Sequence, residues 1–392
     1  MVSKLRGVSI LVVAGSGLTV PTQNNSDAFP PPRGIIFGNI SQIRCQPMRR
    51  VLTAVLCFCL CVLGASTPRA NAAASPKPLQ IYFIDVEGGQ ATLVVSPSGE
   101  SLLIDTGWPG YEGRDADRIL AAAHQAGLKQ IDYVLITHYH RDHVGGVPQL
   151  VDGIKVGTFV DHGPNLEDSE VTRTDYAAYE KAIAGHARVV VKPGWGLPIK
   201  GLQVQVLAAA GDHLTKPLPG SGEANSYCGA EPAAAEDNTE NARSVGVLIT
   251  YGHFRFLDLG DLTKKKELEI ACPNNLIGTV DLFLVTHHGA DLSNPKALDW
   301  ALHPRVAVID NGPRKGSSPA AWQIVHDSPG LEDLWQLHYA ADSDKAHNID
   351  AERIANVKEP CEGKYIKVAA QTDGSFTVTN ARTGTQKTYS KK

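Results

Sequence analysis

The sequence predicts an α/β domain built in layers, in which sheets and helices pack on one another. Two observations indicate this class. From Leu79 onward, short apolar strands and helical segments follow one another along the chain, with no internal repeat and no coiled-coil pattern. The composition of the 392 residues, 43% hydrophobic and 20% charged, excludes a disordered, collagen-like or coiled-coil protein.

Charge divides the chain into two unlike parts. The formal net charge is −4, from 37 basic and 41 acidic side chains. Residues 1–72 contain seven of the basic side chains and one acidic one, so residues 73–392 have a net charge of −10. This acidic balance argues against non-specific binding to DNA or to anionic membranes.

Residues 48–72 have the three parts of a secretory signal peptide. Residues 48–50 (Met-Arg-Arg) form a basic start, and residues 51–63 form an apolar run that is short for a membrane span. Residues 70–72 (Ala-Asn-Ala) match a small-x-small cleavage site. We expect cleavage there and an exported protein, periplasmic or secreted, with no stable membrane span; an anchor that stays attached is the alternative.

Residues 1–47 precede this signal and resemble no folded domain. They combine an apolar patch at residues 8–20 with three consecutive prolines at residues 30–32. We interpret them as a non-native or disordered leader and expect the true start at Met48.

Cysteine usage agrees with export. Four of the seven cysteines precede residue 73, and the rest of the chain keeps Cys228, Cys272 and Cys361. In an oxidising compartment this allows one disulfide and leaves one thiol. No two of these three stand in a CxxC pair, so a cysteine-based zinc knuckle is unsupported.

Strand and helix signals alternate in the first part of the domain. Gly88-Gly89 and residues 97–99 are turn signals between strands, and Gly127 ends a helix. The continuous apolar run at 131–136 is typical of a buried strand. We expect helices at 115–126, from 145 and at 174–184, and strands at 81–84, 91–95, 101–104, 131–136, 156–160, 189–191 and 202–207.

The second part begins with a segment that has little periodicity. Residues 208–243 are rich in Ala, Gly, Pro and Asn, as in a lid-like or disordered insert. Asp373-Gly374 is a hairpin signal between two strands. We assign residues 73–312 to the domain and residues 313–392 to a C-terminal extension packed on it. The expected helix is 264–271, and the expected strands are 245–250, 254–257, 280–285, 306–309, 365–369 and 375–379.

Four residues of ligand type follow the apolar strand at 131–136. His138 and His140 are two apart in extended chain and point to one side. Asp142 and His143 stand where the chain turns into a helix, and they can face a second point. Imidazole and carboxylate are ligands for zinc and similar divalent ions, so this run predicts a metal site rather than an incidental polar turn.

This run resembles the HxHxDH motif of the metallo-β-lactamase-fold hydrolases. Three further motifs are similar and occur in the family's order: the "LIDTG" strand end at 103–107, the "TGD" motif at 256–261 and the last metal-ligand motif at 285–289. The resemblance covers roughly residues 79–312. It implies a four-layer αββα metallo-β-lactamase sandwich, here with a C-terminal β-hairpin extension.

The resemblance also implies a role for each motif residue. Asp105 supports the metal loop from behind the ligands, and Asp261 bridges two metal ions. His288, directly before a glycine, is the last ligand in preference to His287. We expect two ions, zinc rather than manganese or iron, held by His138, His140, Asp142, His143, Asp261 and His288.

One ligand of the first ion is left open. The family's histidine after the strand at 202–207 has no matching counterpart, because Asp212 stands at the aligned position and His213 follows one residue later. We therefore consider His213, Asp212, His162 or none of them as this ligand.

One branch of the family fits better still. Residues 83–91 look like the "FLDVGQGDA" opening of the metallo-hydrolase domain of DNA-uptake competence proteins, and the His-His-Gly ending is also similar. That branch often lacks the open histidine. Its members carry this domain beside a multi-span membrane channel. This sequence shows no such channel, so we expect a stand-alone, exported relative of that branch.

The resemblance implies hydrolysis by a metal-bound hydroxide, with Asp142 as the catalytic carboxylate that orients the water. A phosphoester or phosphodiester is the expected substrate, although the acidic charge disfavours nucleic acid. His162, His287 and Arg314, or Lys315 beside it, are candidate substrate contacts. The alternatives are a lactonase or β-lactamase and a non-catalytic binding relative; the oligomeric state is left open.

Overall fold

A computed structural model describes residues 77–230 and 234–392. The chain divides into two units, residues 1–72 and 73–392, and all described residues belong to the second. The predicted leader at 1–47 and signal peptide at 48–72 lie outside the described residues. Within the described ranges, no helix combines the length and the apolar character needed to cross a membrane.

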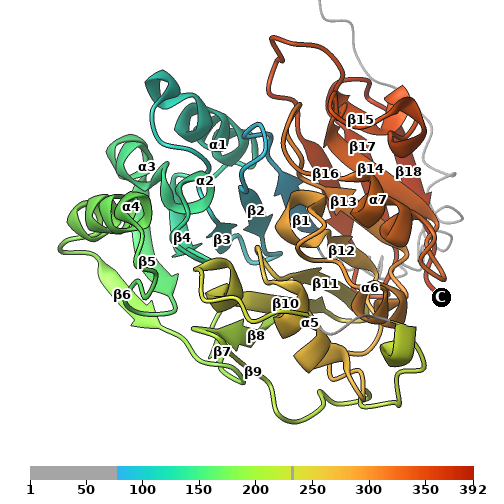
Figure 1. Cartoon of the computed structure of the whole chain (residues 1–392). Coiled ribbons are helices and arrows are strands. Elements are labelled where there is room, and N and C mark those ends of the chain that lie inside the picture. Colours follow the sequence, from blue (N-terminus) through green and yellow to red (C-terminus); the bar gives the residue numbers. More distant parts are fainter. Residues whose placement is uncertain (1–76, 231–233) are drawn as a thin grey trace, which may run out of the picture. The chain divides into compact units, whose positions relative to one another are not determined.

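Two large mixed sheets form the centre of the structure (Figure 1). In spatial order, the first sheet contains β18 (Gln386–Tyr389), β17 (Phe376–Asn380), β16 (Ile366–Ala370), β1 (Leu79–Phe83), β2 (Thr92–Val95), β3 (Ser101–Ile104), β4 (Gln130–Leu135), β5 (Lys155–Asp161) and β6 (Ala187–Val190). The second contains β15 (Ile354–Asn356), β14 (Asp333–His338), β13 (Val306–Ile309), β12 (Leu282–Leu284), β11 (Phe254–Asp258), β10 (Gly246–Tyr251), β8 (Gln203–Ala209) and β7 (Gly196–Leu197), with β9 (Asp212–His213) paired to β8.

Helices cover the outer faces of both sheets (Figure 1). The first sheet is covered by α1 (Arg114–Gln125), α3 (Val147–Gly153) and α4 (Glu170–Ala182), and the single turn α2 (Arg141–Val144) precedes α3. The second sheet is covered by α5 (Lys264–Ala271), α6 (Lys296–Leu302) and α7 (Pro319–His326).

Strand alternation produces these layers. In β1, Ile81 and Phe83 point into the core between the sheets, whereas Tyr82 packs with the helices of the outer layer. The Phe83 ring meets Phe256 of β11 with ring centroids 5.6 Å apart, which joins the two sheets. The order helix, sheet, sheet, helix confirms the predicted αββα sandwich.

The C-terminal residues belong to both sheets. Strands β16 and β17 form the hairpin that the sequence predicted, and β16 pairs with β1 along the edge of the first sheet. Strands β14 and β15 continue the second sheet beside β13. Residues 313–392 therefore extend the sheets themselves, which goes beyond the expected packing on the outside of the domain.

The middle of the segment at 208–243 is attached to the domain by a disulfide and by hydrogen bonds. Near its middle, Cys228 forms a disulfide with Cys272 at the end of α5, with their Cα atoms 5.8 Å apart. Asn225 donates hydrogen bonds to the carbonyls of Ala271 and Ala297. Cys361 keeps a free thiol, so the three cysteines form the one disulfide that their number allowed.

Parallel strands place their carboxyl ends at one edge of the sandwich. Strands β3, β4 and β5 run parallel in the first sheet, and β11 to β14 run parallel in the second. In open α/β sheets, the loops that follow the carboxyl ends of parallel strands are the usual place for a ligand site. All four sequence motifs follow such strand ends.

Candidate metal centre

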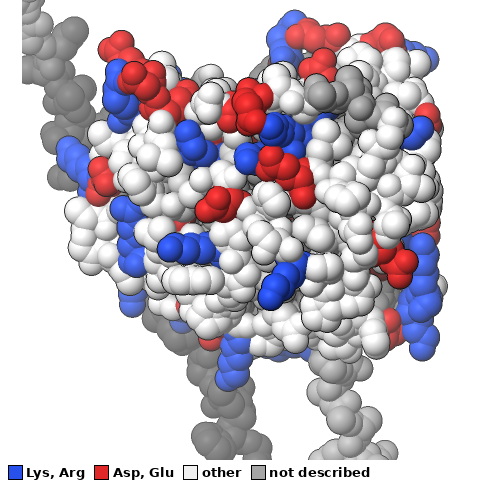
Figure 2. Space-filling view, turned by 60° about the horizontal axis from the view of Figure 1, so that its bottom comes forward, with Lys and Arg blue, Asp and Glu red and all other residues white. Residues whose placement is uncertain are grey.

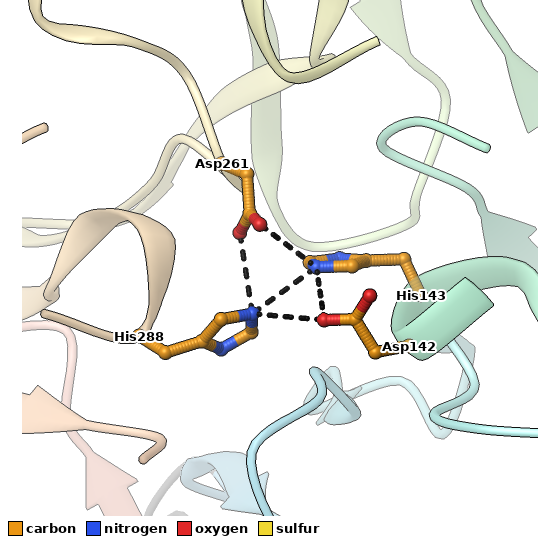
Figure 3. Close-up of side chains that lie close together, drawn as sticks. All are labelled: Asp142, His143, Asp261 and His288. Carbon is orange, nitrogen blue, oxygen red and sulfur yellow. Dashed lines mark hydrogen bonds and ion pairs between the residues drawn. The ribbon is translucent and has the colours of Figure 1, made fainter. Parts of the chain in front are cut away.

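Four buried side chains from three segments converge at this edge (Figure 3). Asp142 and His143 lie on the single turn α2, after β4. Asp261 follows β11, and His288 lies in a 3₁₀ turn after β12. The two sheets therefore contribute to one cluster, which contains four of the six predicted ligands.

The donor atoms of the four side chains face a common point. His143 Nε2 lies 3.2 Å from His288 Nε2, 3.2 Å from Asp261 Oδ2 and 3.4 Å from Asp142 Oδ2. His288 Nε2 lies 3.3 Å from Asp142 Oδ2 and 3.4 Å from Asp261 Oδ1. One donor atom from each side chain lies within 4.8 Å of all the others (Figure 3).

These distances fit a tetrahedral ion. Bonds of about 2.0–2.2 Å to four tetrahedral ligands place the ligand atoms about 3.3–3.6 Å apart. The separations among His143 Nε2, His288 Nε2 and Asp142 Oδ2 are 3.2–3.4 Å. Asp261 approaches His143 with one carboxylate oxygen and His288 with the other, at 3.2 and 3.4 Å. Two imidazoles and two carboxylates are also a donor set that zinc and similar ions accept. The cluster is therefore a buried metal-binding site.

Charge favours a cation at this point. Burial opposes ionisation of Asp142, but Lys315 and His143 outweigh it and hold the pKa of this carboxyl well below its usual range. Burial and Lys315 oppose a charge on His288, yet the carboxylates of Asp261, Asp310 and Asp142 raise its pKa to about 10. The carboxylates thus stay ionised and attract positive charge.

Each histidine of the motifs has one ring nitrogen next to an oxygen atom. His143 Nδ1 is hydrogen-bonded to Asp105 Oδ2 at 2.7 Å, whereas His288 Nδ1 lies 3.2 Å from Asp310 Oδ1 without forming a hydrogen bond to it. Such contacts fix the tautomer of a ligating imidazole and leave its other nitrogen free for the ion. Asp105 also accepts hydrogen bonds from the backbone N–H and the hydroxyl of Thr137, and so it joins β3 to the metal loop.

The same pattern extends to the first two histidines of the run. His138 Nδ1 lies 3.0 Å from the Thr137 hydroxyl, and His140 Nε2 lies 2.9 Å from Glu167 Oε2. His138 Nε2 is buried with no hydrogen-bond partner among the described residues, 3.9 Å from Asp261 Oδ2. Burial and the neighbouring imidazoles hold the pKa of His138 well below its usual value, so its ring is neutral as a ligand requires.

His287 points to the same carboxylate from another direction. Its Nε2 lies 3.4 Å from Asp261 Oδ2 and its Nδ1 lies 3.1 Å from the Ser293 hydroxyl. Both His287 and His288 adopt positive φ angles, 57° and 54°, which turn their side chains toward the cluster. The structure thus places His287, expected as a substrate contact, beside the Asp261 carboxylate.

His213 and Asp212 lie away from the cluster, which corrects the first two candidates for the open ligand. Strand β8 ends in a tight turn at Ala210 and Gly211, and the short strand β9 then leads back along it. His213 Nε2 consequently lies 3.4 Å from Glu269 of α5, and Asp212 is exposed.

His162 and Arg314 are also corrected as substrate contacts. The His162 side chain is fully buried, so it offers no surface to a substrate, and its Nε2 lies 2.9 Å from Glu240 Oε2. Arg314 is two-thirds exposed and faces Asp342 and Glu359. Its neighbour Lys315 instead contacts Asp142 Oδ2.

Several residues around the cluster were not predicted. Glu240 accepts hydrogen bonds from the backbone of Tyr139 and Leu166, so the end of the 208–243 segment is attached to the metal loop. Neither Glu240 nor Glu167 belongs to any sequence pattern. Asp310 does belong to a sequence pattern, because it directly follows the apolar strand β13 just as Asp105 follows β3.

A layered αββα sandwich with a buried His/Asp metal site at its strand ends defines the metallo-β-lactamase class of fold. Residues 84–226 match the model of the metallo-beta-lactamase superfamily, so the chain carries a domain of this superfamily. That match includes the His138–His143 run; Asp261 and His288 lie beyond it and are added by the structure.

Curated relatives support the competence branch. The chain is 26% identical over 248 residues to ComE operon protein 3 of Bacillus subtilis and 25% identical over 235 residues to Recombination protein 2 of Haemophilus influenzae. Each alignment covers 59% of this chain but only 28% and 24% of those relatives. A UPF0173 protein of Pyrococcus abyssi is 27% identical over 223 residues, 56% of this chain and 79% of the relative.

Replacing Asp105 by Asn should weaken metal binding about 10- to 100-fold, because His143 loses the acceptor that orients it. A competitive titration with a chromophoric chelator measures this affinity. Asp132→Asn is the matched control, because Asp132 accepts hydrogen bonds from Ser101 far from the cluster. Equal affinities in the two variants would contradict the role of Asp105.

His288→Ala should lower the metal content by one ion per chain, because it removes one of four donors. His213→Ala should keep the wild-type content, because His213 faces Glu269. Elemental analysis of the purified, metal-loaded variants measures both. A loss of metal in His213→Ala would return this residue to the ligand set.

Proposed function

We propose that this protein is a metal-dependent hydrolase of phosphoesters or phosphodiesters. The observation that carries the proposal is the position of the Asp261 carboxylate. This carboxylate contacts the imidazoles of His143 and His288. The imidazoles of His138 and His287 also approach it. A carboxylate with imidazoles around it suits two ions that share a ligand.

We assign two ions, zinc in preference to manganese or iron. The second ion takes the four-ligand cluster, and the first takes His138, His140 and the shared Asp261. His287 supplies the open ligand of the first ion, because its Nε2 already faces Asp261 Oδ2. This assignment requires a content of two ions per chain.

The ions would supply a nucleophile at neutral pH, because coordination lowers the pKa of water from about 16 to about 7. The protein's side chains hold and orient the reactants. Asp142, with one oxygen in the cluster, is placed to orient the attacking water. Asp105, Asp310 and Glu167 hold the imidazoles in position, so little reorganisation is needed during reaction.

Three features favour a phosphodiester or phosphoester. In the resembled family, an Asp at the position of Asp261 is typical of phosphodiesterases, lactonases and thioesterases, whereas β-lactamases usually have Cys or Ser. One relative is named as a recombination protein, and recombination acts on DNA, whose backbone is a phosphodiester. Lys315 adds a positive charge at the edge of the cluster.

Surface charge favours a small substrate over a long nucleic acid. On the face shown in Figure 2, the described Lys and Arg side chains stand apart or beside acidic ones, with uncharged surface between them. Binding to a long polyanion usually draws on a continuous basic patch. A short or single phosphodiester makes no such demand.

The metal-loaded full chain should hydrolyse bis(p-nitrophenyl) phosphate, lose this activity on chelation and recover it with added zinc. His140→Ala should lower kcat/KM by more than about 100-fold, because loss of a ligand exceeds the loss of an outer partner. His213→Ala, which alters a histidine outside the centre, should keep the wild-type rate.

A β-lactam and a lactone, assayed in parallel, test the alternatives. Turnover of either one without turnover of the phosphodiester would replace the proposal with an acyl hydrolase. Metal binding without turnover of any of the three would instead indicate a binding relative of the fold.

We also propose that the protein is exported, periplasmic or secreted. The signal-like pattern at 48–72 supports this, and so does the Cys228–Cys272 disulfide, because disulfides persist mainly in oxidising compartments.

Protein isolated from its natural source should begin at Ala73 and contain the linked Cys228–Cys272 peptide. Peptide mapping without reduction measures both features. Peptides from residues 48–72 would contradict cleavage, and peptides from upstream of Met48 would contradict the proposed start.

A further inference from the structure

Lys315 lies at the edge of the metal centre on the loop that follows β13. Its ammonium contacts Asp142 Oδ2, an atom that is also one of the cluster's donors. The adjacent Arg314 turns outward to Asp342 and Glu359. The loop thus directs one of two neighbouring cations into the site and the other into solvent.

Close backbone contacts hold this loop in place. A Cβ on Gly316 would lie 2.2 Å from the His288 carbonyl oxygen, and one on Gly312 would lie 2.5 Å from the Glu87 carbonyl oxygen. The Ser317 N–H donates a hydrogen bond of 2.7 Å to the His288 carbonyl. The position of Lys315 is therefore fixed by the turn that carries a metal ligand.

The Lys315 side chain is partly open to solvent. Its exposed fraction is 37%, against 10% for Asp142. Its Nζ lies 5.1 Å from the centre of the Trp108 ring, which is itself only half-buried. A molecule that approaches the centre from this side meets the ammonium before it meets the buried ligands.

Metal binding would change the surroundings of Lys315. Asp142 would share its charge with a bound ion, and the ammonium would then stand beside a second positive charge. A cation in a half-buried position needs an anionic partner. A phosphate oxygen that also faces the ions satisfies this need, with a charge-assisted hydrogen bond to Nζ.

We propose that Lys315 forms an anion subsite that binds a negatively charged oxygen of the substrate beside the metal centre. This rests on the proposed function and deepens it, because it makes the preferred substrate an anionic ester. It also gives a specific role to one basic residue in an acidic chain.

The test compares Lys315→Met with the matched control Arg314→Met in the metal-loaded full chain. Calorimetry with inorganic phosphate should show affinity weaker by about ten- to a hundredfold in Lys315→Met, the range for a lost charged hydrogen bond. Arg314→Met should bind phosphate as the wild type does. Lys315→Arg should recover part of the affinity, and all variants should keep their metal content.

Kinetics supply a second readout. Lys315→Met should raise KM for bis(p-nitrophenyl) phosphate, and it should lower kcat/KM for this anionic ester by a larger factor than for the neutral p-nitrophenyl acetate. Equal losses on both esters, loss of metal or unchanged phosphate affinity would overturn the subsite and leave Lys315 as a counterion of Asp142. If the wild type hydrolyses neither ester, the proposed function fails, whereas the phosphate titration still decides the subsite.

Discussion

The structure depends on one buried convergence, in which the carboxylates of Asp142 and Asp261 meet the Nε2 atoms of His143 and His288. Burying ionised carboxylates is costly unless opposite charge and hydrogen bonds accompany them. The fold meets this demand with imidazoles, with Lys315 and with a ring of outer acceptors such as Asp105. The four side chains come from both sheets, so the sandwich must assemble before the convergence exists.

Backbone geometry shows how closely the surrounding loops are fitted to this centre. Asp105, His287 and His288 all adopt positive φ, which non-glycine residues rarely do, and all three side chains face the cluster. At Gly316 there is no room for a side chain, because a Cβ would meet the His288 backbone. Asp105, His287 and His288 are among ten non-glycine residues with positive φ in the described part of the chain, and they are the ones whose side chains face the cluster.

The sequence predicted the parts of the centre that local pattern determines. Each of Asp105, Asp142 and Asp261 stands near the end of an apolar strand, and strand ends are readable from alternation and turns. Glu240 and Glu167 were not predictable, because they come from irregular segments whose position depends on tertiary contacts. His213 was placed wrongly for a similar reason: strand β8 turns back at Ala210, and this turn carries His213 toward α5. The overall sandwich, read from strand alternation and the motifs, was predicted correctly.

An acidic chain and an anionic substrate are compatible once charge is counted locally. Residues 73–392 have a net charge of −10, but binding depends on the field at the site rather than on the total. With two divalent ions, the centre would carry four positive charges against the two of Asp142 and Asp261, with its histidines neutral. Lys315 adds one more at the open edge. Bound ions would thus be the largest charges present, and under the proposed function they would make an anionic ester the complement of this centre. The basic residues on the face shown in Figure 2 need contribute nothing to that attraction.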